Sequence, residues 1–304
     1  MGCFMIINLR KTAEEAWKVF APYHNKFVPY RDATMGTCSY KCTILDCLRG
    51  LEYGMKLGWY NYSTFNVQEY QHYEKVENGD LNWIVPGKFI AFSGPQNVTD
   101  KYGSFTPDDY CPIFKKFGVS LVVRLNKPQY EKQKFVKAGI KHLDLYFLDG
   151  STPPDDIVEK FLEQAEQEKG AIAIHCKAGL GRTGSLIALY CMKHFGFPPA
   201  AFTGWIRIAR PGSILGPQQQ YLITMDERMM KLGGEAKRRD LLGVSNSPSA
   251  GTPQIKKQLE DLSLKERTKM TKEEEFKGKF GDMGQAENLL KQKYEKRGVG
   301  SPKK

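Results

Sequence analysis

The stretch HCKAGLGRT, residues 175–183, combines a nucleophile with groups that bind an anion. Cys176 ends a short apolar run, Gly179 and Gly181 follow, and Arg182 opens a helical pattern. A strand that enters a glycine-bearing turn at a helix N-terminus directs successive backbone N–H groups toward one point, which binds anions. The spacing therefore predicts a phosphate cradle made by Lys177, Ala178, Gly179, Leu180, Gly181 and Arg182.

Cys176 lies at the bottom of this predicted cradle. Backbone amides, a helix dipole and a guanidinium together favour the thiolate form of a cysteine, and the Arg182 fork can hold two phosphate oxygens at once. A thiolate beneath a bound phosphate is an in-line nucleophile, so we predict a cysteinyl-phosphate intermediate. No Gly-Lys-Ser/Thr closes the loop, which excludes a nucleotide P-loop. We expect His175 to orient the loop by hydrogen bonding.

This chemistry also needs a proton donor for the departing oxygen, and four aspartates precede the loop: Asp144, Asp149, Asp155 and Asp156. Asp149 is the first polar residue after the predicted strand 140–148, at the sheet edge where α/β proteins bind ligands. We assign the acid to Asp149, whose carboxylate then activates water in the second step. Because loop donors and Arg182 meet the developing charge, we expect no metal or cofactor.

The elements that would position these groups can be predicted from periodicity. Residues 1–75 are mostly helical, with Thr12 as a helix cap. From about Asn82, short strands alternate with helices, which is typical of an α/β domain with a largely parallel sheet. The expected elements are a strand pair or one bent strand in WIVPGKFIAFSG, strands VSLVVRL (119–125) and AIAI (171–174), and a helix in TPPDDIVEKFLEQAEQEKG.

Composition narrows the function classes. No run of eighteen apolar residues occurs in the 304-residue chain, so we expect no stable membrane insertion. The net charge of +11 indicates an anionic partner, and charge alone does not choose between nucleic acid, acidic lipid and phosphate on a substrate. Seven cysteines, an odd number without framework spacing, favour a reducing intracellular compartment.

The loop resembles the signature of protein tyrosine and dual-specificity phosphatases. Its flanks, FLDGSTPPDDIVEKFL, WIRIARPGSILGPQQQYL and YEKVENGDLNWIVPGKFIAFSGP, resemble the cell-division-cycle-fourteen phosphatases, which act at mitotic exit. The resemblance implies an α/β catalytic domain of the dual-specificity phosphatase type at 76–232, with helices around a mostly parallel sheet. It also implies a truncated helical part of a second, non-catalytic phosphatase-like domain at 1–75. A basic disordered tail is expected at 233–304.

The resemblance also implies roles for individual residues. Asp149 matches the family's general acid, Gln218 and Gln219 would position the hydrolytic water, and the hydroxyl of Thr183 can donate to the Cys176 sulfur. An acidic substrate groove is implied at Glu74 and Asp80, whereas Gln71 stands where the family usually has glutamate.

The implied substrates are phosphoproteins made by proline-directed, cyclin-dependent kinases in cell-cycle control. Phosphoserine followed by proline and a downstream basic residue would be preferred, and phosphotyrosine accepted. Nucleic acid would not be required. We expect the chain in the nucleus and the cytoplasm, with the Lys-Arg-Arg cluster at 237–239 as a candidate import signal.

Two alternatives remain open from the sequence. A phosphoinositide phosphatase of the tensin-related kind would carry a second loop lysine where this chain has Leu180, which argues against that activity. A weakly active scaffold that only binds phosphoproteins is the other, and the presence of Cys176, Arg182 and Asp149 together argues against it.

Overall fold

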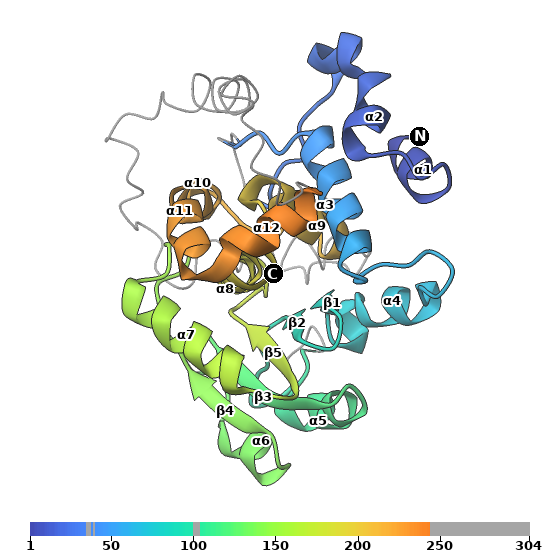
Figure 1. Cartoon of the computed structure of the whole chain (residues 1–304). Coiled ribbons are helices and arrows are strands. Elements are labelled where there is room, and N and C mark those ends of the chain that lie inside the picture. Colours follow the sequence, from blue (N-terminus) through green and yellow to red (C-terminus); the bar gives the residue numbers. More distant parts are fainter. Residues whose placement is uncertain (35–37, 39, 100–103, 244–304) are drawn as a thin grey trace, which may run out of the picture.

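A five-stranded sheet with helices on both faces forms the centre of the protein (Figure 1). The computed structural model describes residues 1–34, 38, 40–99 and 104–243. The sheet has the order β1-β2-β5-β3-β4, and only the β1–β2 pair is antiparallel. Its strands are β1 (Leu81–Val85), β2 (Phe89–Phe92), β3 (Val119–Arg124), β4 (Lys141–Asp144) and β5 (Ala171–His175). The predicted α/β fold with a mostly parallel sheet is confirmed.

Side chains of the inner strands alternate between two hydrophobic clusters, one on each face of the sheet. Along β2, Phe89 and Ala91 enter the first cluster, whereas Ile90 and Phe92 enter the second. This is the two-residue period of a strand that is buried on both faces. The first cluster is closed mainly by α7 (Asp155–Gln167), α8 (Gly181–Phe195) and α9 (Pro199–Ala209), and the second by α5 (Pro107–Lys116) and α6 (Gln133–Lys137).

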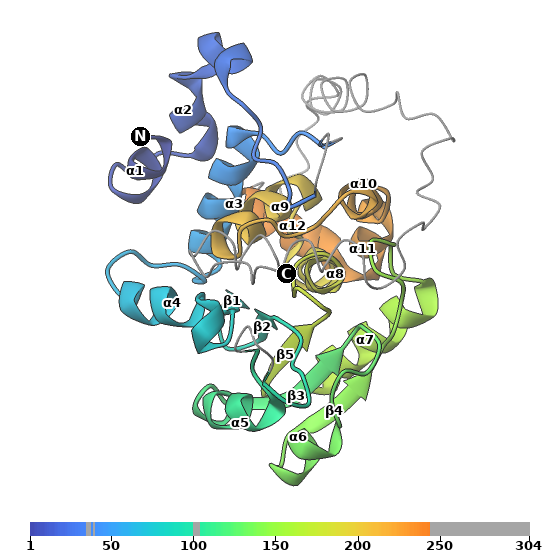
Figure 2. The same cartoon turned by 180° about the vertical axis from the view of Figure 1, so that it is seen from behind.

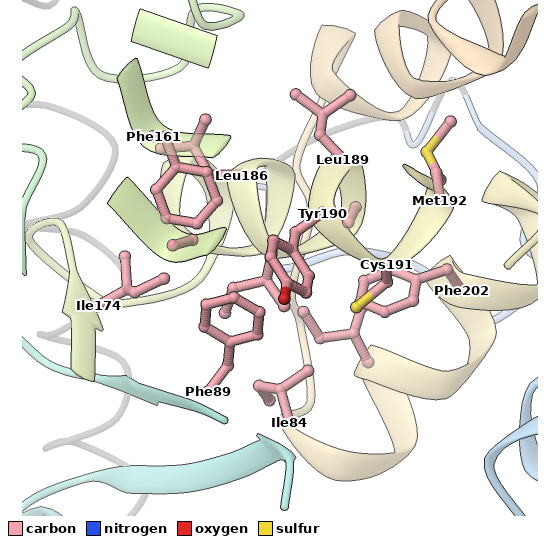
Figure 3. Packing of buried hydrophobic residues seen from close by; sticks show 14 of the residues in the cluster. Ile84, Phe89, Phe161, Ile174, Leu186, Leu189, Tyr190, Cys191, Met192 and Phe202 are labelled. Carbon is pink, nitrogen blue, oxygen red and sulfur yellow. The ribbon is translucent and has the colours of Figure 1, made fainter. Parts of the chain in front are cut away.

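The first cluster packs β5 and α8 together (Figure 3). The ring of Phe89 packs near those of Phe161 of α7 and Tyr190 of α8, with centroid distances of 6.1 and 4.8 Å. Ile174 of β5 and Leu186 of α8 are fully buried in the same cluster. Because one core holds β5 and α8, it fixes both ends of the loop that contains Cys176.

Strand β4 is shorter than the predicted strand 140–148, because it ends at Asp144. Its neighbour β3 ends at Arg124, and the next residue, Leu125, donates its N–H to His175 O of β5. The chain beyond β4 still runs beside β3, since Leu145 N donates to Arg124 O at 2.9 Å. Asp149 therefore lies in a turn several residues beyond the strand end.

In the N-terminal part of the chain, α1 (Gly2–Ile7) and α2 (Ala13–Lys18) pack against α3 (Ile44–Lys56) (Figure 2). Thr12 forms a capping box with Glu15 at the start of α2, as predicted, and Thr43 caps α3 in the same way. None of the helices in the described ranges has the length and apolar character needed to cross a membrane.

Helices α3 and α9 approach each other closely at glycines. A Cβ at Gly50 would lie 2.5 Å from Ala201 O and from Trp205 N of α9, and one at Gly204 would lie 2.5 Å from Asp46 O of α3. We expect Gly50→Ala to destabilise the protein by about 1–3 kcal/mol, because the added methyl has no space. Denaturant unfolding measures this change. Unchanged or raised stability would contradict the close contact, because alanine is otherwise favoured over glycine in helices by about 1 kcal/mol.

The ordered chain continues past the predicted start of the tail at 233. Helix α12 (Glu235–Leu242) lies within that segment, and its Leu241 is buried in the first cluster. Arg238 of the Lys-Arg-Arg cluster forms an ion pair with Asp226 and donates to Gly196 O. The cluster is thus partly built into the fold. The remainder of the predicted tail lies outside the described residues.

Candidate active site

The loop from Cys176 to Arg182 connects the carboxyl end of the central strand β5 with the N-terminus of α8. Cys176 follows the strand directly and is 3% exposed, whereas Arg182 is the second residue of the helix. Helix N-termini carry partial positive charge, so an anion is favoured at this loop. The predicted strand–loop–helix arrangement is present.

The backbone carbonyls of the loop are held from outside. His175 Nδ1 holds Cys176 O at 2.8 Å, and Gly94 N donates to Lys177 O at 2.9 Å. Arg210 donates to Ala178 O at 3.0 Å and to Gly179 O at 2.8 Å. Ile214 N donates to Leu180 O at 3.4 Å. A trans peptide is planar, so a carbonyl that points outward directs the next N–H inward. The N–H groups of residues 177–181 are therefore aimed at the loop interior, which is the geometry of an anion site.

Two loop glycines lie where other protein atoms leave little space for a side chain. Gly179 has φ +65°, and a Cβ there would lie 2.0 Å from Phe92 O. A Cβ at Gly181 would lie 2.7 Å from Gln218 Oε1. From the sequence, these glycines were expected to let the backbone approach an anion. The structure shows that they also let the loop pack against β2 and α10 (Pro217–Thr224).

Arg182 and Asp149 lie together, although 33 positions separate them in the sequence. Arg182 NH2 is 3.1 Å from Asp149 Oδ1, and NH1 donates to Phe147 O at 2.9 Å. The Arg182 side chain is fully buried and that of Asp149 is 13% exposed. The structure thus brings the predicted acid to the predicted phosphate-binding arginine.

The other residues predicted to assist catalysis differ in their surroundings. Thr183 is fully buried, and its hydroxyl makes no hydrogen bond to a described residue, so the predicted bond to the Cys176 sulfur is not formed here. Gln218 accepts from Leu215 N, donates to Ser151 O and lies beside Gly181 at the start of α8, so it stands between the loop and the turn after Asp149.

Gln219, by contrast, does not face the loop. Its side chain is 1% exposed and is held by Arg207 and by Asp32, which accepts from Gln219 Nε2 at 2.8 Å. These contacts give Gln219 a structural place between the N-terminal segment and α10. Of the two glutamines, only Gln218 lies against the loop.

His175 ends a hydrogen-bond chain of fixed polarity. Its Nδ1 faces the Cys176 carbonyl, which only accepts, so Nδ1 carries the hydrogen. Burial lowers the pKa of His175 to about 3 and that of His142 to about 4, so both rings are neutral at pH 7. His175 Nε2 then accepts from Tyr130 OH at 2.7 Å, and Tyr130 accepts from His142 Nε2 at 2.8 Å. These hydrogen bonds are consistent with the expected role of His175 in orienting the loop.

The residues predicted to line an acidic groove do not share one environment. Gln71 and Glu74 are exposed at the end of α4 (Val67–Tyr73), three positions apart and so on neighbouring parts of the helix surface. Asp80 is 2% exposed, and its carboxylate pairs with Arg210 NH1 at 3.0 Å. Asp80 therefore does not share the exposed surface of Gln71 and Glu74, and its predicted part in substrate binding stays a prediction.

Several residues that shape the site were missed from the sequence: Asp32, Tyr130, His142, Arg207 and Arg210. The two arginines carried a usable signal, since charged residues in the apolar stretch WIRIARPG are buried only when they are paired or hydrogen-bonded. Among the described residues, no group of three His, Cys, Asp or Glu side chains is arranged to hold a metal ion.

Comparison with known proteins agrees with this geometry. The family described as "Dual specificity protein phosphatase, N-terminal half" matches residues 1–54, and "Swiss Army Knife protein, DSP-PTPase phosphatase domain" matches residues 78–219. Human dual specificity protein phosphatase CDC14A is 54% identical over 226 residues, which are 73% of this chain and 38% of that protein.

Two further relatives are also similar over most of this chain but over a smaller share of their own length. Human dual specificity protein phosphatase CDC14C is 44% identical over 268 residues, 87% of this chain and 60% of that protein. Tyrosine-protein phosphatase cdc-14 of Caenorhabditis elegans is 48% identical over 227 residues, 73% of this chain and 32% of that protein. The chain thus spans less than two thirds of each of these relatives. By these similarities and by the site that it carries, the chain belongs to the cell-division-cycle-fourteen family of dual-specificity phosphatases.

Proposed function

We propose that this chain hydrolyses phosphate monoesters on proteins through a cysteinyl-phosphate intermediate. The observation that carries the proposal is that buried Cys176 begins a loop whose carbonyls are held from outside, with Arg182 and Asp149 in contact 3.1 Å apart at the same loop. A nucleophile, an anion site and a proton donor are thereby gathered at one sheet edge.

In the first step, the phosphate oxygens bind the loop N–H groups and Arg182. The Cys176 thiolate attacks phosphorus, the bond from phosphorus to the seryl, threonyl or tyrosyl oxygen breaks, and Asp149 gives its proton to that oxygen. A phosphate dianion competes with Asp149 for Arg182. Its negative charge also favours the protonated carboxyl, which is the form needed to donate.

In the second step, the Asp149 carboxylate takes a proton from water, whose oxygen attacks phosphorus, and the sulfur–phosphorus bond breaks. Gln218 lies between the loop and the turn after Asp149, a position from which its amide can orient the water. The buried hydroxyl of Thr183 is available to donate to the departing sulfur. The products are inorganic phosphate and the regenerated thiolate.

The proposed substrates are phosphoserine-proline sites with a downstream basic residue, made by proline-directed kinases, together with phosphotyrosine sites. Exposed Glu74 supports the selection of a basic residue. Tyr70 of the same helix donates to Ala209 O, next to Arg210, which ties this helix to the loop. Leu180 is buried against Leu215, so this loop position offers no second cation for an inositol phosphate.

Turnover of three substrates by the full chain tests this function. The substrates are a phosphoserine-proline peptide with a downstream lysine, a phosphotyrosine peptide and a soluble short-chain phosphoinositide. We expect phosphate release from both peptides, fastest from the first, and little from the phosphoinositide. Faster release from the phosphoinositide would contradict the proposed substrate class. Absence of release from all three would contradict the enzymatic function.

Gln71→Glu is expected to raise kcat/KM for the peptide with a downstream lysine by about 1.4-fold to fivefold. The expected size follows from an exposed ion pair, which contributes about 0.2–1 kcal/mol. The gain should shrink with added salt, because exposed charges are screened. A peptide with alanine in place of the lysine is the control and should change little. An equal gain for both peptides would place Gln71 outside the substrate groove.

Our proposed setting is the nucleus and the cytoplasm, in the reversal of cyclin-dependent kinase phosphorylation during the cell cycle. All seven cysteines of the chain are free thiols in the structure, which fits a reducing compartment. Fractionation of cells that produce the full chain, with detection of the protein in each fraction, tests the location.

A further inference from the structure

Arg210 holds two adjacent carbonyls of the phosphate loop. It follows α9 and is 2% exposed. Its Nε donates to Gly179 O at 2.8 Å and its NH2 to Ala178 O at 3.0 Å. Because each peptide is planar, these two bonds fix the N–H groups of Gly179 and Leu180, which point into the loop. A single guanidinium therefore sets the direction of two N–H groups that can donate hydrogen bonds to a phosphate.

Asp80 supplies the counter-charge for this arginine. Its Oδ1 lies 3.0 Å from Arg210 NH1, and its carbonyl accepts from the same nitrogen at 3.0 Å. Asn82 Oδ1 accepts a further bond from NH1 at 2.7 Å. A buried guanidinium without an acidic partner is strongly unfavourable, so Asp80 is what allows Arg210 to stay at the loop.

The backbone of Asp80 is shaped for this place. Its φ is +46°, a left-handed conformation that few residues other than glycine, asparagine and aspartate adopt readily. Ser93 N donates to Asp80 O at 3.2 Å, and Tyr110 OH donates to the neighbouring Gly79 O at 2.7 Å. The turn before β1 is therefore anchored from two sides, and it presents the carboxylate to Arg210 and not to solvent.

We propose that Arg210 and Asp80 are positioning residues of the phosphate site, which together set its affinity for phosphate on any substrate. This inference rests on the proposed phosphatase function. It gives Asp80 a role different from the selection of a basic residue. The side chain of Asp80 is 3% exposed and engaged by Arg210, so its influence passes through the loop and is the same for every phosphate ester.

Asp80→Asn and Arg210→Lys test the proposal. Asparagine keeps the size and the left-handed conformation at position 80 while removing the charge, so the turn is retained. Lysine keeps the charge at position 210, but a single ammonium group cannot reproduce the fork that binds two carbonyls. Asp156→Asn is the matched control, because Asp156 is exposed in the first turn of α7 and pairs with Lys160 on the same helix.

We expect both test variants to lower kcat/KM by about 10- to 100-fold, because small misplacement of donors has effects of that size. The loss should be equal for an aryl phosphate, a peptide with a downstream lysine and the same peptide with alanine instead. A loss confined to the lysine peptide would overturn the proposal and return Asp80 to substrate selection. Full activity of Arg210→Lys would overturn it too, since charge alone would then be sufficient.

Binding of inorganic phosphate gives a readout that does not depend on turnover. Calorimetry on the full chain should show phosphate affinity reduced in Asp80→Asn by the same factor as kcat/KM, and unchanged in Asp156→Asn. Unchanged phosphate affinity in a folded Asp80→Asn protein, verified by its thermal unfolding, would overturn the proposal. If the wild-type chain bound phosphate but released no phosphate from the substrates, the proposed phosphatase function would be contradicted. The comparison of phosphate affinities would still test the role of Asp80 at the phosphate site.

Discussion

Cys176→Ser is expected to lower turnover of a phosphoserine peptide by on the order of 10⁴- to 10⁶-fold, the range seen when an enzyme loses its covalent nucleophile. A serine hydroxyl is hardly ionised at neutral pH, so it cannot replace the thiolate. The inward-directed N–H groups and Arg182 remain, because the carbonyls that orient the loop are held by residues other than Cys176. Phosphopeptide binding should therefore persist, and calorimetry beside a turnover assay measures both quantities.

Cys3→Ser is the matched control for this variant. Cys3 is an exposed free thiol in α1, so its removal should leave turnover unchanged. Residual turnover of Cys176→Ser within tenfold of the wild type would show that another group is the nucleophile. Loss of phosphopeptide binding together with turnover would instead show that the sulfur contributes to the anion site.

Asp149→Asn is expected to slow the hydrolysis of phosphoserine by about 10²- to 10⁴-fold, the usual contribution of a general acid. An aryl phosphate with a good leaving group needs little protonation, so its rate of cysteine phosphorylation should fall far less. The same substitution removes the carboxylate that contacts Arg182 at 3.1 Å. Phosphate should then bind more tightly, because it no longer competes for the guanidinium. Burst kinetics with both substrates, and calorimetry with phosphate, measure these effects.

Asp155→Asn serves as the control, since Asp155 was a candidate acid and lies exposed in the first turn of α7, paired with Arg228. It should leave both substrates nearly unaffected. Equal losses on phosphoserine and on the aryl phosphate in Asp149→Asn would place the proton donor at another residue.

Local signals were sufficient for the elements that carry the chemistry. The buried apolar run before Cys176 forms β5, which lies between β2 and β3 in the sheet. The amphipathic pattern after Pro154 forms α7, whose Phe161 and Leu162 are buried. The apolar run before Cys176, the glycines after it and the helical pattern from Arg182 together placed the loop between a strand and a helix. In each case, the predicted strand, helix or loop depends on residues that are close together in the sequence.

Properties set by distant residues could not be predicted in this way. Asp80 looked like an exposed acid in the polar stretch YEKVENGD, and only Arg210, 130 positions later, draws it into the interior. Tyr130 and His142 likewise acquire their role by meeting His175 across the sheet. The length of β4 was overestimated because a strand ends where its partner ends, and the partner is not visible in the strand's own pattern.

The contacts around Asp32 bear on how small a working catalytic unit can be. Asp32 Oδ2 accepts from Gly216 N, and Tyr30 and Arg207 exchange hydrogen bonds between the N-terminal segment and α9. The close approach of α3 and α9 at their glycines further joins the N-terminal segment to the rest of the protein. A chain cut at the predicted boundary near residue 75 would lose the scaffold of the loops that hold Arg210 and Gln218. We therefore expect the smallest active form of this chain to begin before residue 75, within the N-terminal helices.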